Sequence, residues 1–134
     1  MLSIKDMMLK QEVRKLLWTG SGGSLFPGQE VPLDLSGYDA IEVHFFESQV
    51  LGRRFNISQN FVLDTTGVIR SFSNLANNVA TIFLQRRVSA TSTGVTFGDG
   101  EYRAVTSSGA PTTANDVLVP IAIYGLRKLG GGTN

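Results

Sequence analysis

Hydrophobic and polar residues alternate along much of the chain beyond residue 28, and this alternation is typical of strands with one buried face. In "YDAIEVHFFES", Ile41, Val43 and Phe45 share one face, while Glu42 and His44 share the other. The segment "NNVATIFLQRRVSA" repeats the pattern. "RRFNISQNFVLD", "GVIRSFSNL", "GVTF" and "EYRAV" are further strand candidates. The pattern therefore predicts a β-rich fold.

Turn signals separate these candidate strands. The sequence "GDG" at 98–100 predicts a tight hairpin, because glycine supplies the positive φ that such turns need. Residues 19–29 and 106–116 are rich in small and polar residues and predict loops. About seven or eight short strands at regular spacing predict an all-β fold, an antiparallel β-sandwich of jelly-roll-like type.

The N-terminal 17 residues predict a short α-helix. Ser3 is a candidate N-cap, Asp6 follows three residues later, and residues 7–12 are good helix formers. Leucines recur every seven residues without a second heptad partner, so a long coiled coil is not predicted. The expected organisation is a helix at 1–17 for attachment or oligomerisation, a β-sandwich at 18–129 and a flexible tail at 130–134.

The C-terminal stretch "VLVPIAIY" at 117–124 is apolar on both faces. Its β-branched residues and Pro120 disfavour a helix, and it is too short to span a membrane. A strand remains, in which Pro120 should lie at an edge, a bulge or a strand start because it cannot donate a ladder hydrogen bond. The alternation predicts Val119, Ile121 and Ile123 in the core, and Leu118, Ala122 and Tyr124 against the helix or another chain.

Composition and charge narrow the possible functions. The 134 residues fit one domain, with 42% hydrophobic and 17% charged residues and a net charge of +1. Such a balance does not favour nucleic-acid binding. The chain has no cysteine, which excludes disulfides and thiolate chemistry. Charges interrupt the N-terminus, so it does not read as a signal peptide, and we expect a protein that is soluble at synthesis and does not insert into membranes.

Candidate catalytic motifs are weak. His44 is the single histidine and predicts no metal site by itself. "GSGGS" at 20–24 lacks the third glycine of a dinucleotide loop and the Lys-Ser/Thr pair of a P-loop. Asp99 lies beside a turn without calcium-loop spacing. Asp34 and Asp39 are acids whose separation in space the sequence does not give. We therefore expect no enzyme activity, no metal and no cofactor.

Two arginine pairs, at 53–54 and 86–87, suggest subunit contacts, because neighbouring strand residues point to opposite faces and arginine is enriched at interfaces. Surface solubility and salt bridges are the alternative role for these arginines. The candidate interface residues are Leu9, Val13, Leu16, Arg53, Arg54, Arg86, Arg87, Leu118 and Tyr124. Candidate ligand or receptor residues are Trp18, Thr93, Asp99, Tyr102, Ser108 and Thr112, on or near loops expected at one end of the sandwich.

Three stretches together resemble a known group of proteins. They are "LLWTGSGGSLFPGQEVPLDLSGYDAIEVHFF", "RRVSATSTGVTFGDGEYRAV" and "LVPIAIYGLRK", and they span residues 16–128. Their order resembles small structural proteins of tailed bacteriophages and prophages, which are encoded among tail, neck or fibre genes. The resemblance implies a β-rich module that assembles into oligomers, often trimers, and it carries no catalytic residues.

The resulting hypothesis is a structural virion protein in a tail, neck, head fibre or tail fibre. It would assemble in the bacterial host cytoplasm, bind itself as a homotrimer, bind other virion proteins and contact a host cell-surface glycan. One alternative is a carbohydrate-binding module with Trp18 and Tyr102 as its aromatic platform. A second is a β-sandwich hydrolase that uses Asp34, Asp39, Asp99 and His44.

Overall fold

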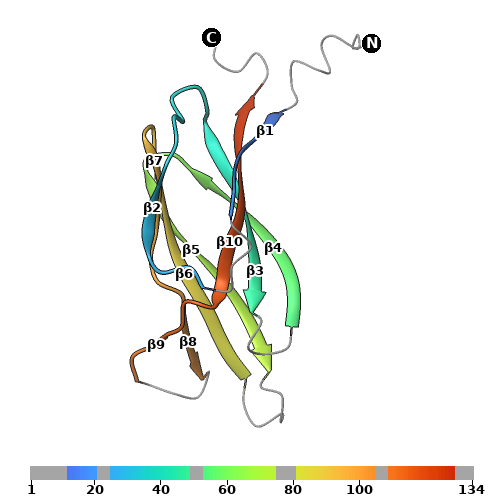
Figure 1. The fold of residues 1–134 in the computed structure, drawn as a ribbon, viewed down its shortest axis with the longest axis vertical. Helices are drawn as coiled ribbons and strands as arrows, with labels where there is room; N and C mark the ends of the chain where they lie inside the picture. The colour runs from blue at the N-terminus through green and yellow to red at the C-terminus, as the bar shows by residue number, and fades with distance from the viewer. Residues whose placement is uncertain (1–11, 21–24, 49–52, 75–80, 105–108, 129–134) are drawn as a thin grey trace.

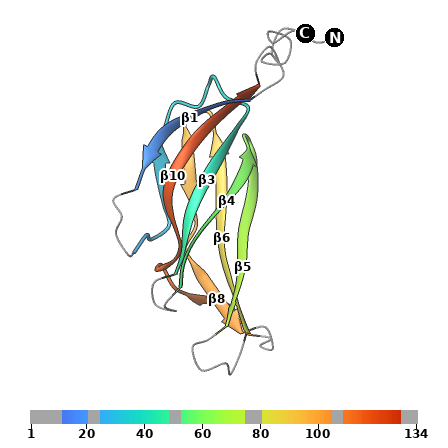
Figure 2. The ribbon, with the colours of Figure 1, turned by 90° about the vertical axis from the view of Figure 1, so that its right-hand side faces the viewer.

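The fold consists of two antiparallel sheets packed face to face (Figures 1 and 2). The structure is a computed structural model that describes residues 12–20, 25–48, 53–74, 81–104 and 109–128. Within those ranges the regular secondary structure consists of strands, with no helix. The prediction of an all-β fold with antiparallel sheets is therefore confirmed.

The first sheet, sheet A, has four strands in the order β1-β10-β3-β4. β10 pairs with β1 on one side and with β3 on the other over most of its length. The bounds are β1 (Glu12–Thr19), β10 (Val117–Lys128), β3 (Ala40–Ser48) and β4 (Arg53–Val62).

The second sheet, sheet B, is built around one long strand, β6 (Thr81–Thr91). β5 (Thr65–Asn74) pairs with β6 along its full length on one side. On the other side β7 and β8 follow one another end to end, separated by residues 98–100. The remaining bounds are β2 (Gln29–Pro32), β7 (Gly94–Phe97), β8 (Glu101–Ala104) and β9 (Thr112–Thr113).

The "GDG" segment therefore does not form the predicted tight hairpin. β7 and β8 do not pair with each other; both pair with β6. The amide of Gly98 donates to the carbonyl of Arg87 at 2.9 Å, which keeps the break attached to β6. The segment thus interrupts the pairing along one side of β6, between β7 and β8.

The N-terminal segment also differs from its prediction. Residues 12–17, expected in the helix, belong to strand β1, and residues 1–11 lie outside the described residues. β1 pairs with β10 from Glu12 opposite Lys128 to Thr19 opposite Ala122. These ladder hydrogen bonds satisfy the backbone at an otherwise open edge of β10, and this tertiary pairing outweighs the local helix preference.

The core lies between the sheets and follows the alternation seen in the sequence. Ile41, Val43 and Phe45 of β3 are fully buried. They face buried residues of sheet B, and the rings of Phe45 and Phe97 meet edge to face with centroids 6.3 Å apart. The other fully buried apolar side chains of the described chain include Leu35, Leu84, Val88, Val95, Leu118 and Ile123.

Pro120 lies at a bulge in β10, as the sequence required. It is opposite Phe45 and buried, whereas Ala122 is opposite His44, so Ile121 is the extra residue. The carbonyl of Ile121 accepts a hydrogen bond from Gly20 at 2.8 Å. The bulge shifts the alternation, so Pro120 takes the core position predicted for Ile121, which is half-buried.

Leu118 is a second departure from simple alternation. It is fully buried and has a φ of 48°. A bulky residue in this left-handed region is strained. Its burial within one chain removes it from the predicted subunit interface. Val119 and Ile123 are buried as predicted, and Ala122 and Tyr124 are half-buried.

The sandwich is elongated, and its two ends differ (Figures 1 and 2). At one end the start of β1 lies beside the end of β10, because Glu12 pairs with Lys128. At the other end β3, β5 and β8 finish and β4 and β6 begin. We refer to these as the terminal end and the distal end.

Candidate functional site

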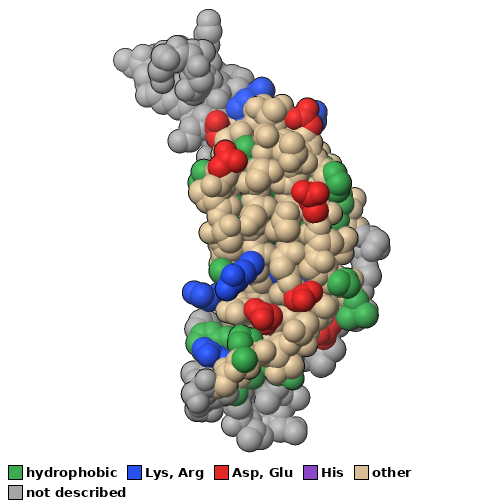
Figure 3. All heavy atoms as spheres, turned by 90° about the vertical axis from the view of Figure 1, so that its left-hand side faces the viewer, with side chains coloured by type: hydrophobic (Ala, Val, Ile, Leu, Met, Phe, Trp, Pro, Cys, Tyr) green, Lys and Arg blue, Asp and Glu red, His purple; other side chains and the backbone are tan. Residues whose placement is uncertain are grey.

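A pocket of about 360 Å³ opens on sheet B toward the distal end. Its lining comes from β5, β6 and β8 and from the segment that precedes β9. Figure 3 shows this side of the molecule, where basic and hydrophobic side chains gather next to each other in the lower half. The lining residues are Arg70, Phe83, Gln85, Tyr102, Arg103 and Pro111.

Strand register places four of the pocket residues in two adjacent rows across β6, whereas Tyr102 lies opposite the buried Leu84. Arg70 lies opposite Gln85, and Phe83 lies opposite Arg103. Directly opposed residues share a face of the sheet, and residues two apart on one strand share it too. The guanidinium carbon of Arg103 lies 5.7 Å from the centroid of the Phe83 ring, within cation–π range. The two arginines therefore approach the face around Phe83 from opposite sides of β6.

The guanidinium groups of the two pocket arginines are not paired with an acidic side chain of the described chain. Within the described part of the chain, neither Arg70 nor Arg103 makes a hydrogen bond or salt bridge to another side chain. The acid of this region, Glu101, instead accepts a hydrogen bond from Gln85 Nε2 at 3.0 Å. Tyr102 is 38% exposed. The pocket thus combines two cations with aromatic surface.

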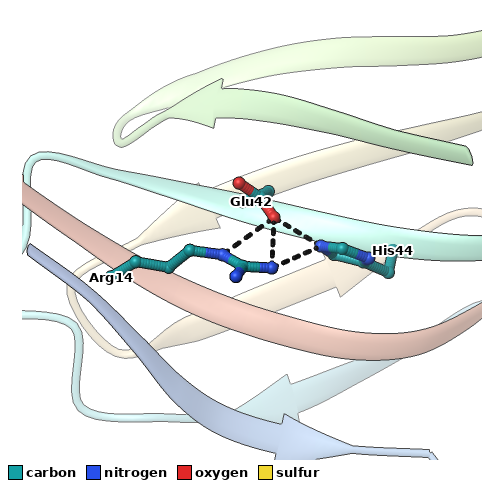
Figure 4. Close-up of polar contacts among 3 residues, drawn as sticks. All are labelled: Arg14, Glu42 and His44. Carbon is teal, nitrogen blue, oxygen red and sulfur yellow. Dashed lines mark hydrogen bonds and ion pairs between the residues drawn. The ribbon is translucent and has the colours of Figure 1, made fainter. Parts of the chain in front are cut away.

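A separate polar cluster lies on the outer face of sheet A (Figure 4). Glu42 Oε2 is its centre: it contacts Arg14 Nε at 3.1 Å, Arg14 Nη2 at 2.9 Å and His44 Nε2. The Arg14 guanidinium also lies 3.8 Å from the ring centroid of Tyr124. These contacts join β1 to β3 across β10.

The cluster has no catalytic geometry that we can identify. Ser58 lies directly opposite His44 across β3 and β4, yet no hydrogen bond joins the two side chains in the described chain. The imidazole nitrogen Nε2 donates to the Glu42 carboxylate, and Arg14 Nη2 lies 3.2 Å from the same nitrogen. The arrangement is that of an ion-pair network which fastens an edge strand.

The ionisation of Glu42 makes a testable contribution to stability. Partial burial raises the pKa of Glu42, but hydrogen bonds from His44 and Arg14 and their charges outweigh it and leave the pKa below the ordinary value of 4.5. A carboxylate with a depressed folded-state pKa stabilises the fold above its unfolded pKa, and this stabilisation is lost as pH falls through the folded pKa.

We therefore expect Glu42→Gln to lower the free energy of unfolding by about 1 kcal/mol at pH 6 and by little at pH 3. Urea denaturation at the two pH values measures the difference. Glu30→Gln, on exposed β2, is the matched control and should show no such pH dependence. An equal loss at pH 3 and pH 6 would show that the Glu42 charge is not stabilising.

Arg86, a candidate for a subunit contact or for surface salt bridges, is a buried cation. Its side chain is 0% exposed and fills the break between β7 and β8. Burial lowers its pKa to about 10, and the nearby Asp99 opposes this shift, so Arg86 remains charged at neutral pH. The guanidinium donates to the carbonyls of Gly98 (2.7 Å), Phe26 (2.8 Å), Leu118 (2.9 Å), Val117 (2.9 Å) and Asn115 (3.5 Å).

This placement corrects the interface prediction for Arg86. Arg87, its neighbour, is exposed, so the two arginines do point to opposite faces. Arg86 points inward and donates hydrogen bonds to carbonyls of its own chain rather than to a partner subunit. Five carbonyls from three separate segments converge on it, and no local sequence signal reports such a convergence.

The other interface candidates have different surroundings. Leu16 is 49% exposed on the outer face of sheet A, directly opposite the half-buried Tyr124. Leu9 lies outside the described residues. Val13, Arg53 and Arg54 lie in strands β1 and β4, but their side chains are outside what the structure describes.

The ligand candidates are not gathered at one end. Thr93 is exposed at the turn between β6 and β7, whereas Thr112 pairs with Tyr102 toward the distal end. Trp18 is half-buried, with its ring edge to face with Phe26 at 6.1 Å. Asp99 accepts a hydrogen bond from the Gly28 amide at 2.8 Å. Ser108 lies outside the described residues.

Among the ligand candidates within the described residues, Tyr102 alone lines the pocket. The sequence reading missed Arg70, Phe83, Gln85, Arg103 and Pro111. Arg70 and Arg103 are isolated charges in separate strands, and their proximity depends on how β5 and β8 pair with β6.

The acids of the hydrolase alternative do not converge. Asp34 accepts hydrogen bonds from the Ser36 hydroxyl (2.7 Å) and amide (3.1 Å), which lower its pKa. Asp39 precedes β3, and Asp99 lies at the break in sheet B. The lining of the pocket on sheet B includes none of these carboxylates, and a shallower cavity lined by Pro32, Leu33, Asp34, Ser92 and Thr93 includes Asp34 alone. Among the described residues no group of three or more His, Asp or Glu side chains could hold a metal ion.

No described helix is long and apolar enough to cross a membrane. Comparison of the chain with protein-family models, with curated protein sequences and with solved structures finds no match in any of the three.

Proposed function

We propose that this protein is a structural component of a tailed-bacteriophage virion, in the tail, neck or fibres. It is a jelly-roll-like β-module that assembles as a homotrimer, binds other virion proteins and contacts the host surface. The resemblance of residues 16–128 to small phage structural proteins supports the proposal.

One structural observation carries the proposal: the two ends of the elongated sandwich are suited to different tasks. The chain enters and leaves at the terminal end, where Glu12 pairs with Lys128, so attachment to other components acts there. The pocket is lined by residues of β5, β6 and β8 toward the distal end. A rigid β-scaffold with its binding surface away from its attachment point suits host contact.

The outer face of sheet A is the proposed contact between copies. Leu16 and Val62 are 49% and 61% exposed on this face, and Tyr124 lies between β1 and β3. Large apolar side chains in an exposed sheet face favour burial against a partner. The ion-pair network around Glu42 lies on the same face and supplies polar contacts.

Light scattering after size-exclusion chromatography tests the oligomeric state. We expect a mass three times that of the 14.5 kDa chain. Leu16→Glu should convert the trimer to a monomer, whereas Leu25→Glu, a 67% exposed leucine in a loop, should leave it intact. A monomeric wild-type protein at micromolar concentration would contradict the proposal.

The second candidate function, a carbohydrate-binding module, is favoured by the pocket itself. Exposed aromatic and polar side chains around a cavity of this size are typical of small-ligand sites. Tyr102, rather than Trp18, is the aromatic residue to test, because Trp18 packs against the core. Glycan binding by a monomer would favour this function over the virion proposal.

A further inference from the structure

The pocket on sheet B is lined by two positively charged side chains and by no acidic one. Arg70 and Arg103 both line it, and neither has a hydrogen-bond or salt-bridge partner in the described chain. The net charge of the whole protein is only +1, so the concentration of charge is local. Two arginines without acceptors beside an aromatic ring form a receptor for an anion that also has an apolar face.

We propose that the pocket binds an acidic sugar, with the sugar oxyanion held by Arg70 and Arg103 and a ring face packed on Phe83. This inference rests on the glycan-contact part of the proposed function and specifies its ligand. The oxyanion belongs to a uronic-type carboxylate or to a phosphate on a sugar ring. Both groups accept paired hydrogen bonds from a guanidinium.

The spacing of the two arginines suits one sugar unit between them. β5 and β8 lie on opposite sides of β6, and the two arginines are offset by two residues along the strands, so the backbones that carry them are about 12 Å apart. Both side chains are long enough to turn toward a group placed over Phe83 and Gln85. A volume of about 360 Å³ is at the low end for small-molecule sites and accommodates one or two sugar rings.

Contacts within the chain restrict the side chains in and beside the pocket before a ligand binds. The Arg103 guanidinium lies against the Phe83 ring at 5.7 Å, which restricts its position before any ligand arrives. Gln85 Nε2 donates a hydrogen bond to the Glu101 carboxylate at 3.0 Å, which restricts the position of that acid. Glu101 does not line the cavity, but its charge lies on the same face and opposes an anion.

Isothermal titration calorimetry with defined probes tests the inference. The probes are tri-galacturonate, its methyl ester and galactose 1-phosphate, each at 50 mM and 500 mM NaCl. We expect at least one acidic probe to bind, weakening at high salt, and we expect no binding of the methyl ester. The two acidic probes distinguish a carboxylate ligand from a phosphate ligand.

Variants assign the binding to the pocket. Arg103→Ala and Arg70→Ala should each weaken the binding of that acidic probe at least tenfold, and Glu101→Gln should leave it unchanged or strengthen it. Arg87→Ala is the matched control, since Arg87 is an exposed arginine of the same sheet outside the cavity. Thermal melting of each variant confirms that the fold is retained.

Three results would overturn the inference: binding of neither acidic probe, equal binding of acid and methyl ester, or an Arg87→Ala loss as large as that of Arg103→Ala. Equal binding of the methyl ester would leave a neutral glycan site and the attachment role intact. A monomer that binds acidic sugar would instead remove the virion proposal and leave the pocket assignment standing.

Discussion

Replacing Arg86 with methionine is expected to lower the free energy of unfolding by about 4 kcal/mol or more. Methionine fills much of the volume but donates no hydrogen bond. The carbonyls of Gly98, Phe26, Leu118 and Val117 lie within 2.9 Å of the guanidinium and would lose a donor in a buried site. Each buried acceptor without a partner costs about 1–3 kcal/mol before relaxation.

Arg87→Met is the matched control for this prediction. It makes the same chemical change one residue further along β6, where the side chain is exposed, and should alter stability by no more than about 0.5 kcal/mol. Urea denaturation of both variants measures the difference. If Arg86→Met does not yield soluble protein, Arg86→Lys retains the charge with fewer donors and should be intermediate. An Arg86→Met variant as stable as the control would refute the structural role of Arg86.

Gly100→Ala is expected to destabilise the protein by about 3 kcal/mol. A Cβ at this position would lie 2.3 Å from the Ala114 carbonyl oxygen, 2.7 Å from Arg86 Nη2 and 2.8 Å from the Val117 carbonyl oxygen. Arg86 Nη2 and the Val117 carbonyl belong to the buried network around the guanidinium, and the Ala114 carbonyl accepts a hydrogen bond from the Val117 amide at 3.2 Å. The network would have to open to accept one methyl group, because backbone atoms cannot move aside as a flexible side chain does.

Gly37→Ala is the control for Gly100→Ala, because no atom lies within 4 Å of the position its Cβ would take. We expect Gly37→Ala to be neutral or to stabilise by up to about 1 kcal/mol through the unfolded state. Thermal and urea unfolding of the two variants test the pair. Equal stability of the two would show that the segment around Gly100 is less constrained than its contacts imply.

The parts of the fold that could be predicted are those set by neighbouring residues. The alternation in β3 placed Ile41, Val43 and Phe45 in the core, because side chains of a strand point to opposite faces in turn. The bulge at Pro120 followed from its missing amide hydrogen. These outcomes need only the geometry of a single strand.

The parts that could not be predicted depend on which strands meet. Residues 12–17 have helical propensity, but the open edge of β10 recruits them as a strand. Arg86 looks like its neighbour Arg87 until three segments bring carbonyl oxygens to it. The pocket likewise exists only because β5 and β8 flank β6 and bring Arg70 and Arg103 to one face.

The pairing of Glu12 with Lys128 determines how the module would respond to mechanical force. Tension applied between the two chain ends would open the β1–β10 ladder one pair at a time, because its hydrogen bonds would be loaded in sequence. Tension applied between the terminal end and a ligand in the pocket would instead run along the strands and load many hydrogen bonds together. The module would thus open at low force when residues 12 and 128 are pulled away from each other. It would resist a higher force when tension acts between the terminal end and the pocket.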